Sequence, residues 1–147
     1  MTVKMIPDGY HTVQPYMMVK GAKRLLEFVR KVFDATEIEH MSGPGGTVMH
    51  AEVKIGDSTV MIADAQGPWQ PTTAALYVYV PDVDATYKKA LAAGATSSME
   101  PADQFYGDRH GGVKDEFGNF WWIATHIEDV PKEEMARRAQ EYMAQKK

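Results

Sequence analysis

The side chains best suited to chemistry in this sequence are two histidines and a carboxylate in strand-like segments. His50 and Glu52 lie two residues apart, so in a β-strand both would point to one face, and His110 lies in a similar segment further along. Two imidazoles and a carboxylate can form a metal site, and either histidine alone could act as a general base. The alternative is that they are ordinary polar residues of a strand face, since no nucleophile accompanies them. His126 follows the last predicted strand, and we expect it to be structural or surface-exposed.

A second polar segment surrounds Gly107, a residue type that permits unusual backbone angles. Asp108 and Arg109 follow it directly, and we expect them to form a structural ion pair or turn clasp rather than to contact a ligand. Phe105 and Tyr106 have opposite strand parity, so one of the two can face a ligand.

The composition suits one compact domain covering residues 1–147, with 44% hydrophobic and 24% charged residues. The net charge of −4 argues against a nucleic-acid partner, which requires a basic face. Cysteine is absent, which excludes disulfides, thiolate nucleophiles and cysteine-based zinc sites. No stretch approaches the roughly 18 apolar residues of a membrane span, and the start of the chain has no apolar signal region, so we expect no membrane partner and a cytoplasmic location.

The chain repeats itself at an offset of about 60 residues. Each copy has a β-rich run, an amphipathic helix and further β-rich segments. The matching pairs are 14–19 with 75–80, 50–54 with 110–114, and 60–63 with 121–124.

Each half therefore predicts a β-α-β-β-β module, at residues 10–65 and 73–126. Hairpins close the modules at 55–58 and 116–119. The turn-rich linker 66–71 is expected to be a plain connection rather than a ligand lid. A C-terminal helix is predicted over 130–145. Its apolar stripe must dock, either on its own domain or on a second chain.

A duplicated β-α-β-β-β unit resembles the vicinal oxygen chelate superfamily, which includes glyoxalases, extradiol dioxygenases, fosfomycin-modifying enzymes and bleomycin-resistance proteins. The runs 103–109, 113–119 and 123–126 are similar to its PhnB-like branch. The resemblance extends from Tyr10 to Met135 and implies an α+β fold whose mixed sheets curl into a cup. Glu116 stands where that branch usually has proline, and Trp122 stands where it has a small polar residue.

The resemblance also implies where a metal would bind, at one ligand position on the first and last strand of each module. Those positions hold Gln14, Met61, Ala75 and Trp122. Only Gln14 offers a hard donor, because the Met61 thioether is soft, Ala75 has no donor atom and the Trp122 indole has only an N–H group. We therefore expect neither a metal nor another cofactor.

Alternation along the strands predicts which side chains face the cup. One parity packs beneath the helices: Val13, Met17, Val19, Val60, Ile62, Leu76, Val78, Val80, Trp121 and Ile123. The other parity, together with polar rim residues and one indole of the linker, gives the expected ligand-binding set: Gln14, Tyr16, Met18, His50, Glu52, Met61, Trp69, Tyr77, Tyr79, Phe105, His110, Phe120 and Trp122.

Aromatic faces bind planar or cationic molecules at roughly 0.5–2 kcal/mol per good contact. The leading hypothesis is a metal-free protein of the glyoxalase/bleomycin-resistance type that sequesters a small antibiotic or metabolite, with no catalytic residue. The resemblance further implies a homodimer. One alternative is a metal-dependent lyase or dioxygenase with displaced ligands. Another is a structural or protein-interaction module whose aromatic side chains fill the cup.

Overall fold

The computed structural model describes residues 2–146, and within them two compact units separate between Ala74 and Ala75. The first unit contains β1 (Tyr16–Val19), α1 (Ala22–Phe33), β2 (Thr36–Ser42), a 3-10 turn (Pro44–Gly46), β3 (Val48–Ile55) and β4 (Ser58–Asp64). The second unit contains β5 (Ala75–Tyr79), α2 (Val83–Ala92), β6 (Thr96–Asp103), β7 (Asp108–Lys114), β8 (Phe120–His126) and α3 (Lys132–Gln145).

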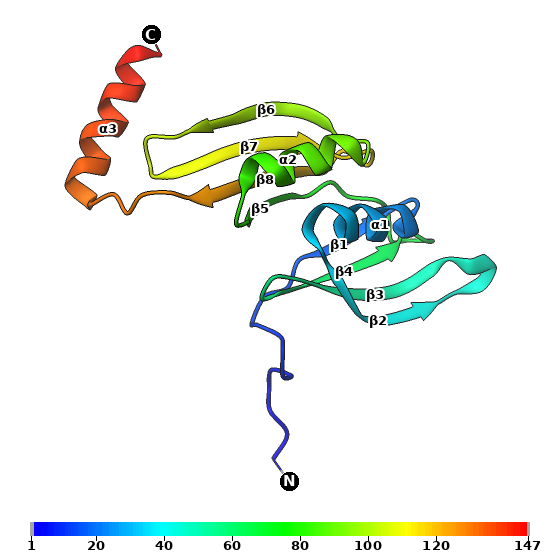
Figure 1. The fold of residues 1–147 in the computed structure, drawn as a ribbon. Helices are drawn as coiled ribbons and strands as arrows, with labels where there is room; N and C mark the ends of the chain where they lie inside the picture. The colour runs from blue at the N-terminus through cyan, green and yellow to red at the C-terminus, as the bar shows by residue number, and fades with distance from the viewer. Residues whose placement is uncertain (1, 147) are drawn as a thin grey trace. The chain divides into compact units, whose positions relative to one another are not determined.

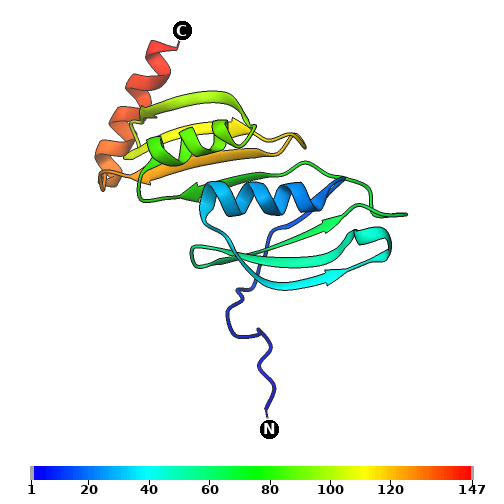
Figure 2. The same cartoon turned by 45° about the vertical axis from the view of Figure 1, so that its right-hand side comes forward.

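Each unit folds as a four-stranded mixed sheet with one helix against one face (Figures 1 and 2). The strand orders are β1-β4-β3-β2 and β5-β8-β7-β6, and in both sheets the first pair is parallel and the other two are antiparallel. The predicted α+β fold with duplicated β-α-β-β-β modules is confirmed.

The helix starts are fixed by carboxylates. In the first unit, Asp64 at the end of β4 accepts hydrogen bonds from the backbone N–H groups of Gly21 and Ala22, at 3.0 and 2.9 Å. In the second unit, Asp82 caps α2 by accepting from the Ala85 N–H at 3.2 Å. These bonds satisfy backbone donors that a helix leaves unpaired at its N-terminus.

The two adjacent tryptophans point to opposite faces of β8. Trp121 is 0% exposed, and its indole N–H donates to the Asp115 carboxylate at 2.9 Å. Asp115 also accepts from the backbone N–H groups of Phe117 and Asn119, so one carboxylate organises the β7–β8 turn and satisfies the buried indole. Trp122 is half-buried on the opposite face of the strand.

The predicted core face is confirmed on most strands. Its fully buried members are Met17, Val19, Val60, Ile62, Trp121 and Ile123. Leu76, Val78 and Val80 on the edge strand β5 and just beyond it are only half-buried. The prediction for Val13 was wrong: its side chain is 79% exposed, because β1 begins only at Tyr16 and the preceding residues do not share the strand's alternation.

The C-terminal helix α3 begins at Lys132 and has no fully buried residue. It contacts the loop between β6 and β7, where the rings of Tyr142 and Phe105 lie 5.1 Å apart and Arg138 donates to the Phe105 carbonyl at 3.1 Å. Of the helices described between residues 2 and 146, none combines the length and apolar character that crossing a membrane requires.

Candidate functional site

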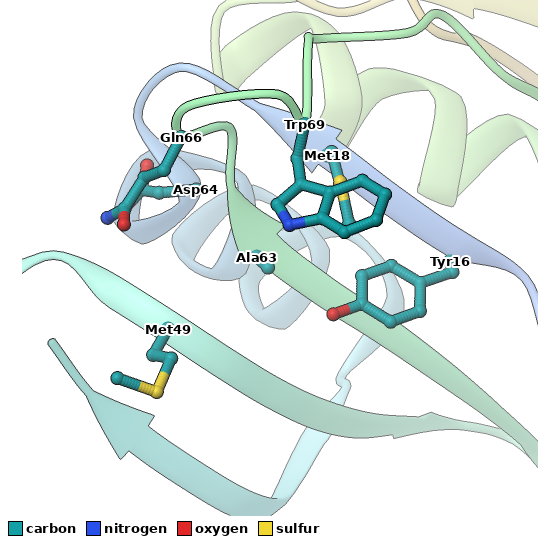
Figure 3. A pocket seen from close by; sticks show the side chains of 7 residues that line it. All are labelled: Tyr16, Met18, Met49, Ala63, Asp64, Gln66 and Trp69. Atoms are coloured by element: carbon teal, nitrogen blue, oxygen red, sulfur yellow. The ribbon is translucent and has the colours of Figure 1, made fainter.

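A cavity of about 430 Å³ lies on the face of the first sheet opposite α1 (Figure 3). Its wall combines two aromatic rings, two thioethers and three smaller or polar side chains: Tyr16, Met18, Met49, Ala63, Asp64, Gln66 and Trp69. Three of these, Tyr16, Met18 and Trp69, belong to the predicted ligand-binding set. The other four were not predicted to line it.

Local backbone bonds place the cavity wall. Tyr16 and Met18 alternate with buried neighbours on β1, which directs their side chains away from the helix. After β4 the chain turns tightly, and the Trp69 N–H donates to the Gln66 carbonyl at 2.9 Å. The Thr72 N–H then donates to the Met18 carbonyl at 3.2 Å. The linker therefore runs beside β1 and brings the Trp69 indole to the cavity (Figure 3).

A buried carboxylate lies next to this wall. Glu52 on β3 is 6% exposed, and it accepts hydrogen bonds from the Tyr10 hydroxyl and from Nε2 of His50, the latter at 2.8 Å. Burial by itself would raise the pKa of Glu52, but the two hydrogen bonds and the nearby imidazole hold that pKa below its ordinary value. Glu52 is therefore an acceptor-only carboxylate at neutral pH.

His50 links this carboxylate to the cavity. Its Nδ1 lies 3.0 Å from the Tyr16 hydroxyl, and the two rings are 5.4 Å apart. The cavity-lining phenol, the imidazole and the carboxylate thus form one continuous hydrogen-bonded chain. Met61 lies on the same face between them, since it pairs with both Tyr16 and Glu52 in the sheet register.

Tyr10 completes the chain and was not predicted from the sequence. It precedes β1 in a segment without strand periodicity, which is why alternation does not identify it. The adjacent Gly9 carbonyl accepts from the Thr59 hydroxyl and the Lys54 ammonium, both at 2.9 Å. These two bonds hold the segment over the β3–β4 hairpin and so place the Tyr10 hydroxyl at Glu52.

The open face of the second sheet is a cluster of rings. Tyr77 lies 5.3 Å from Tyr79 and 5.0 Å from His110, measured between ring centroids. Trp122 lies 5.3 Å from His110 and stacks on Phe120 at 5.7 Å. All five residues belong to the predicted ligand-binding set, and the fold of the second unit brings them together.

Asp108 anchors this cluster. It is 4% exposed, and it accepts from the hydroxyls of Tyr77 and Tyr79 at 2.7 and 2.9 Å and bonds His126 Nδ1 at 2.8 Å. Burial opposes ionisation, but these three donors hold the pKa of Asp108 below its ordinary value, and burial with the bond to Asp108 raises the pKa of Tyr77. Arg109 forms a structural ion pair with the Asp84 carboxylate at 2.8 Å rather than with its neighbour Asp108.

His110 has one bonded and one buried nitrogen. Nδ1 lies 2.9 Å from the Tyr106 hydroxyl, so Tyr106 rather than Phe105 reaches the open face of the sheet. Nε2 is buried without a hydrogen-bond partner among residues 2–146. The imidazole meets the Trp122 ring edge-on, with 71° between the ring planes. Burial lowers the pKa of His110, which favours the neutral ring.

The sequence matches a profile of the glyoxalase/bleomycin resistance protein/dioxygenase superfamily over residues 10–123. The chain belongs to this superfamily. An uncharacterised protein of Mycobacterium bovis is 34% identical over 134 residues, which cover 84% of this chain and 88% of that protein.

Solved structures with the same fold include TioX from Micromonospora sp. ML1, with a TM-score of 0.63, 24% identity and coverage of 78% of this chain and 99% of that one. They also include a PhnB protein from Bacillus cereus, with a TM-score of 0.65, 19% identity and the same coverage of both chains. The resemblance to this superfamily found in the sequence is confirmed.

The metal positions that the superfamily implies do not fit a hard divalent ion here. The Gln14 amide is turned onto its own loop, where Oε1 accepts from the His11 N–H at 2.5 Å and Nε2 donates to the His11 carbonyl at 2.9 Å. Met61 and Trp122 lack a suitable donor, as does Ala75. In the described part of the chain, residues 2–146, no group of three or more His, Asp or Glu side chains is arranged to hold an ion.

Proposed function

We propose that this superfamily member binds a small cationic aromatic molecule in the cavity of the first unit and sequesters it without turnover. The observation that carries the proposal is the composition of the cavity wall, which brings Asp64 next to the rings of Tyr16 and Trp69. Its volume of about 430 Å³ falls within the usual range for small-molecule sites.

The wall favours a cation by two separate effects. A cation over an aromatic ring gains about 0.5–2 kcal/mol, and the wall offers two rings. Burial opposes ionisation of Asp64, but hydrogen bonds from the backbone of Ala22, Val48 and Gly21 hold its pKa below the ordinary value, so it stays negative at neutral pH. None of the described side chains that line the cavity is a lysine or arginine.

The thioethers widen the range of ligands that the cavity can take. Met18 and Met49 are flexible and polarisable, so they adapt to rings of different shape. The ring cluster on the second sheet offers further stacking surface, and Tyr79 there is exposed.

We also propose a homodimer, since exposed apolar side chains such as Met143 on α3 leave surface for a second copy to cover.

Calorimetric titration with phenyltrimethylammonium tests the proposal. We expect saturable binding that Trp69→Ala weakens about tenfold, because one cation–π contact is lost. Tyr142→Phe on α3, outside the cavity, is the matched control and should bind as the parent does. Absence of saturable binding, or equal binding by the Trp69→Ala variant, would contradict the proposal. Stoichiometric nickel, zinc, manganese or iron in the purified protein would instead favour the metal-dependent lyase or dioxygenase.

A further inference from the structure

We propose that buried Glu52, acting through His50, turns the Tyr16 oxygen into a hydrogen-bond acceptor and so selects ligands with a protonated primary amine or amidine. This inference rests on the proposed function of the cavity and adds the chemical class of the polar group that the ligand must carry. Three groups act in series, namely the carboxylate, the imidazole and the phenol.

The first step is the carboxylate. An ionised Glu52 has two oxygens that can only accept hydrogen bonds. The Tyr10 hydroxyl donates to Oε1, and Oε2 lies 2.8 Å from Nε2 of His50. Since Glu52 supplies no proton, the hydrogen between Glu52 and His50 must be on Nε2.

The second step is the imidazole. A neutral histidine with hydrogen on Nε2 has a lone pair on Nδ1. The Tyr16 hydroxyl lies 3.0 Å from that Nδ1, which is an ordinary hydrogen-bond distance. Tyr16 is therefore the donor in this pair, and His50 is the acceptor.

The third step is the phenol. A tyrosine hydroxyl has one hydrogen and can accept as well as donate. The hydrogen of Tyr16 is directed to His50, so the oxygen presents only lone pairs to the cavity, where the side chain is 44% exposed. Asp64 on the same wall adds negative charge, and its two carboxylate oxygens already accept from three backbone N–H groups. A ligand N–H carried by a cation satisfies both the acceptor character and the negative charge of this wall.

The second unit lacks this hydrogen-bonded chain of carboxylate, imidazole and phenol. Gly112 occupies the position equivalent to Glu52 in the sheet register, and Nε2 of His110 has no hydrogen-bond partner within the described residues. The hydroxyl of Tyr77, equivalent to Tyr16, donates to Asp108 instead. The acceptor polarity is thus a property of the cavity in the first unit.

Nitrogen-15 NMR of the histidine side chains in the full chain tests the first two steps. We expect His50 to carry a hydrogen on Nε2 and a lone pair on Nδ1, and Glu52→Gln to shift the population towards hydrogen on Nδ1, because an amide can donate to Nε2. An Nδ1–H tautomer in the parent protein would overturn the proposal. So would a tautomer that Glu52→Gln leaves unchanged.

Paired calorimetric titrations test the third step. Benzylammonium carries N–H groups, whereas phenyltrimethylammonium has the same charge and ring without them. We expect the parent to prefer benzylammonium by about tenfold, as a hydrogen bond to a charged group provides. Tyr16→Phe keeps the ring and should abolish the preference, Glu52→Gln should reduce it, and Tyr142→Phe should leave it unchanged.

The outcomes separate this inference from the proposed function. If neither cation binds, the cavity is not a cation site and both proposals fail. If both bind equally well to the parent, or if Tyr16→Phe keeps the preference, the cavity binds cations but Tyr16 does not select among them, and only this inference fails.

Discussion

The two units place different side chains in equivalent positions of the same sheet. In the first unit Met61 pairs with Tyr16 on one side and with Glu52 on the other. In the second unit Trp122 pairs with Tyr77 and with Gly112 in the same way. A thioether beside a carboxylate in one unit thus corresponds to an indole beside a glycine in the other.

The indole explains the glycine. A Cβ atom on Gly112 would lie 2.3 Å from Cζ3 and 2.4 Å from Cε3 of Trp122, far inside contact distance. A carboxylate at this position and an indole at 122 therefore exclude each other. The second unit obtains its buried negative charge elsewhere, from Asp108, which binds the phenols directly and leaves His110 against the indole.

The two units have similar residues on the face that the helix covers and different residues on the open face. Val60 and Ile62 on β4 and Trp121 and Ile123 on β8 are all buried beneath a helix, because both modules must cover the same kind of core. On the open face the polar chemistry differs, with an imidazole bonded to a carboxylate in one unit and an imidazole facing an indole in the other. Three substitutions test this contrast between the two open faces.

Gly112→Glu should have the largest effect. The new side chain collides with Trp122, and overpacking of this kind costs about 3 kcal/mol of the free energy of unfolding. Urea denaturation measures the loss. Adding Trp122→Met copies the first unit's pair and should restore a large part of the lost stability, since the two sites are in contact. If the double variant is no more stable than Gly112→Glu alone, the two residues do not exclude each other as described.

Asp108→Asn should have an intermediate effect of about 2 kcal/mol, because an amide replaces the ionised acceptor of two phenols and one imidazole. The pKa of Asp108 is depressed in the fold, so its contribution is present above the ordinary aspartate pKa of about 4 and is lost as the pH falls through the folded value. Melting curves from pH 7 to pH 2 should show a shallower acid decline for this variant. Asp129→Asn, at the exposed partner of His126, serves as the control.

Trp122→Ala should have the smallest measured effect, a change in titration. Burial lowers the pKa of His110, and removing the indole that covers the ring readmits water, so the pKa should rise towards the ordinary histidine value. Proton NMR of the histidine side chains follows this shift. An unchanged pKa of His110 would mean that Trp122 is not the group that excludes water from its imidazole.

The strand alternation and the internal repeat predicted the fold and the two faces of each sheet. The opposite orientations of Trp121 and Trp122 follow from the period of two alone. Hydrogen-bond partners were not predictable in this way. Gln14 precedes β1 and turns onto the His11 backbone, and Tyr10 reaches Glu52 from a segment with no periodic pattern. Such contacts depend on where a strand begins and on the path of the loop that precedes it. The residue types alone determine neither of these.

The carboxylate of Asp64 has a consequence for how this chain can change. It holds the N–H groups of Gly21 and Ala22 at the start of α1 and that of Val48 on β3, at 3.0, 2.9 and 2.7 Å, while it also gives the cavity its negative wall. A mutation that removes this negative charge therefore also removes the hydrogen bonds that connect the start of α1 and Val48 on β3 to β4. The rings and thioethers of the cavity can therefore be substituted more freely than Asp64. The negative charge that meets a ligand is set by a residue that the fold itself requires.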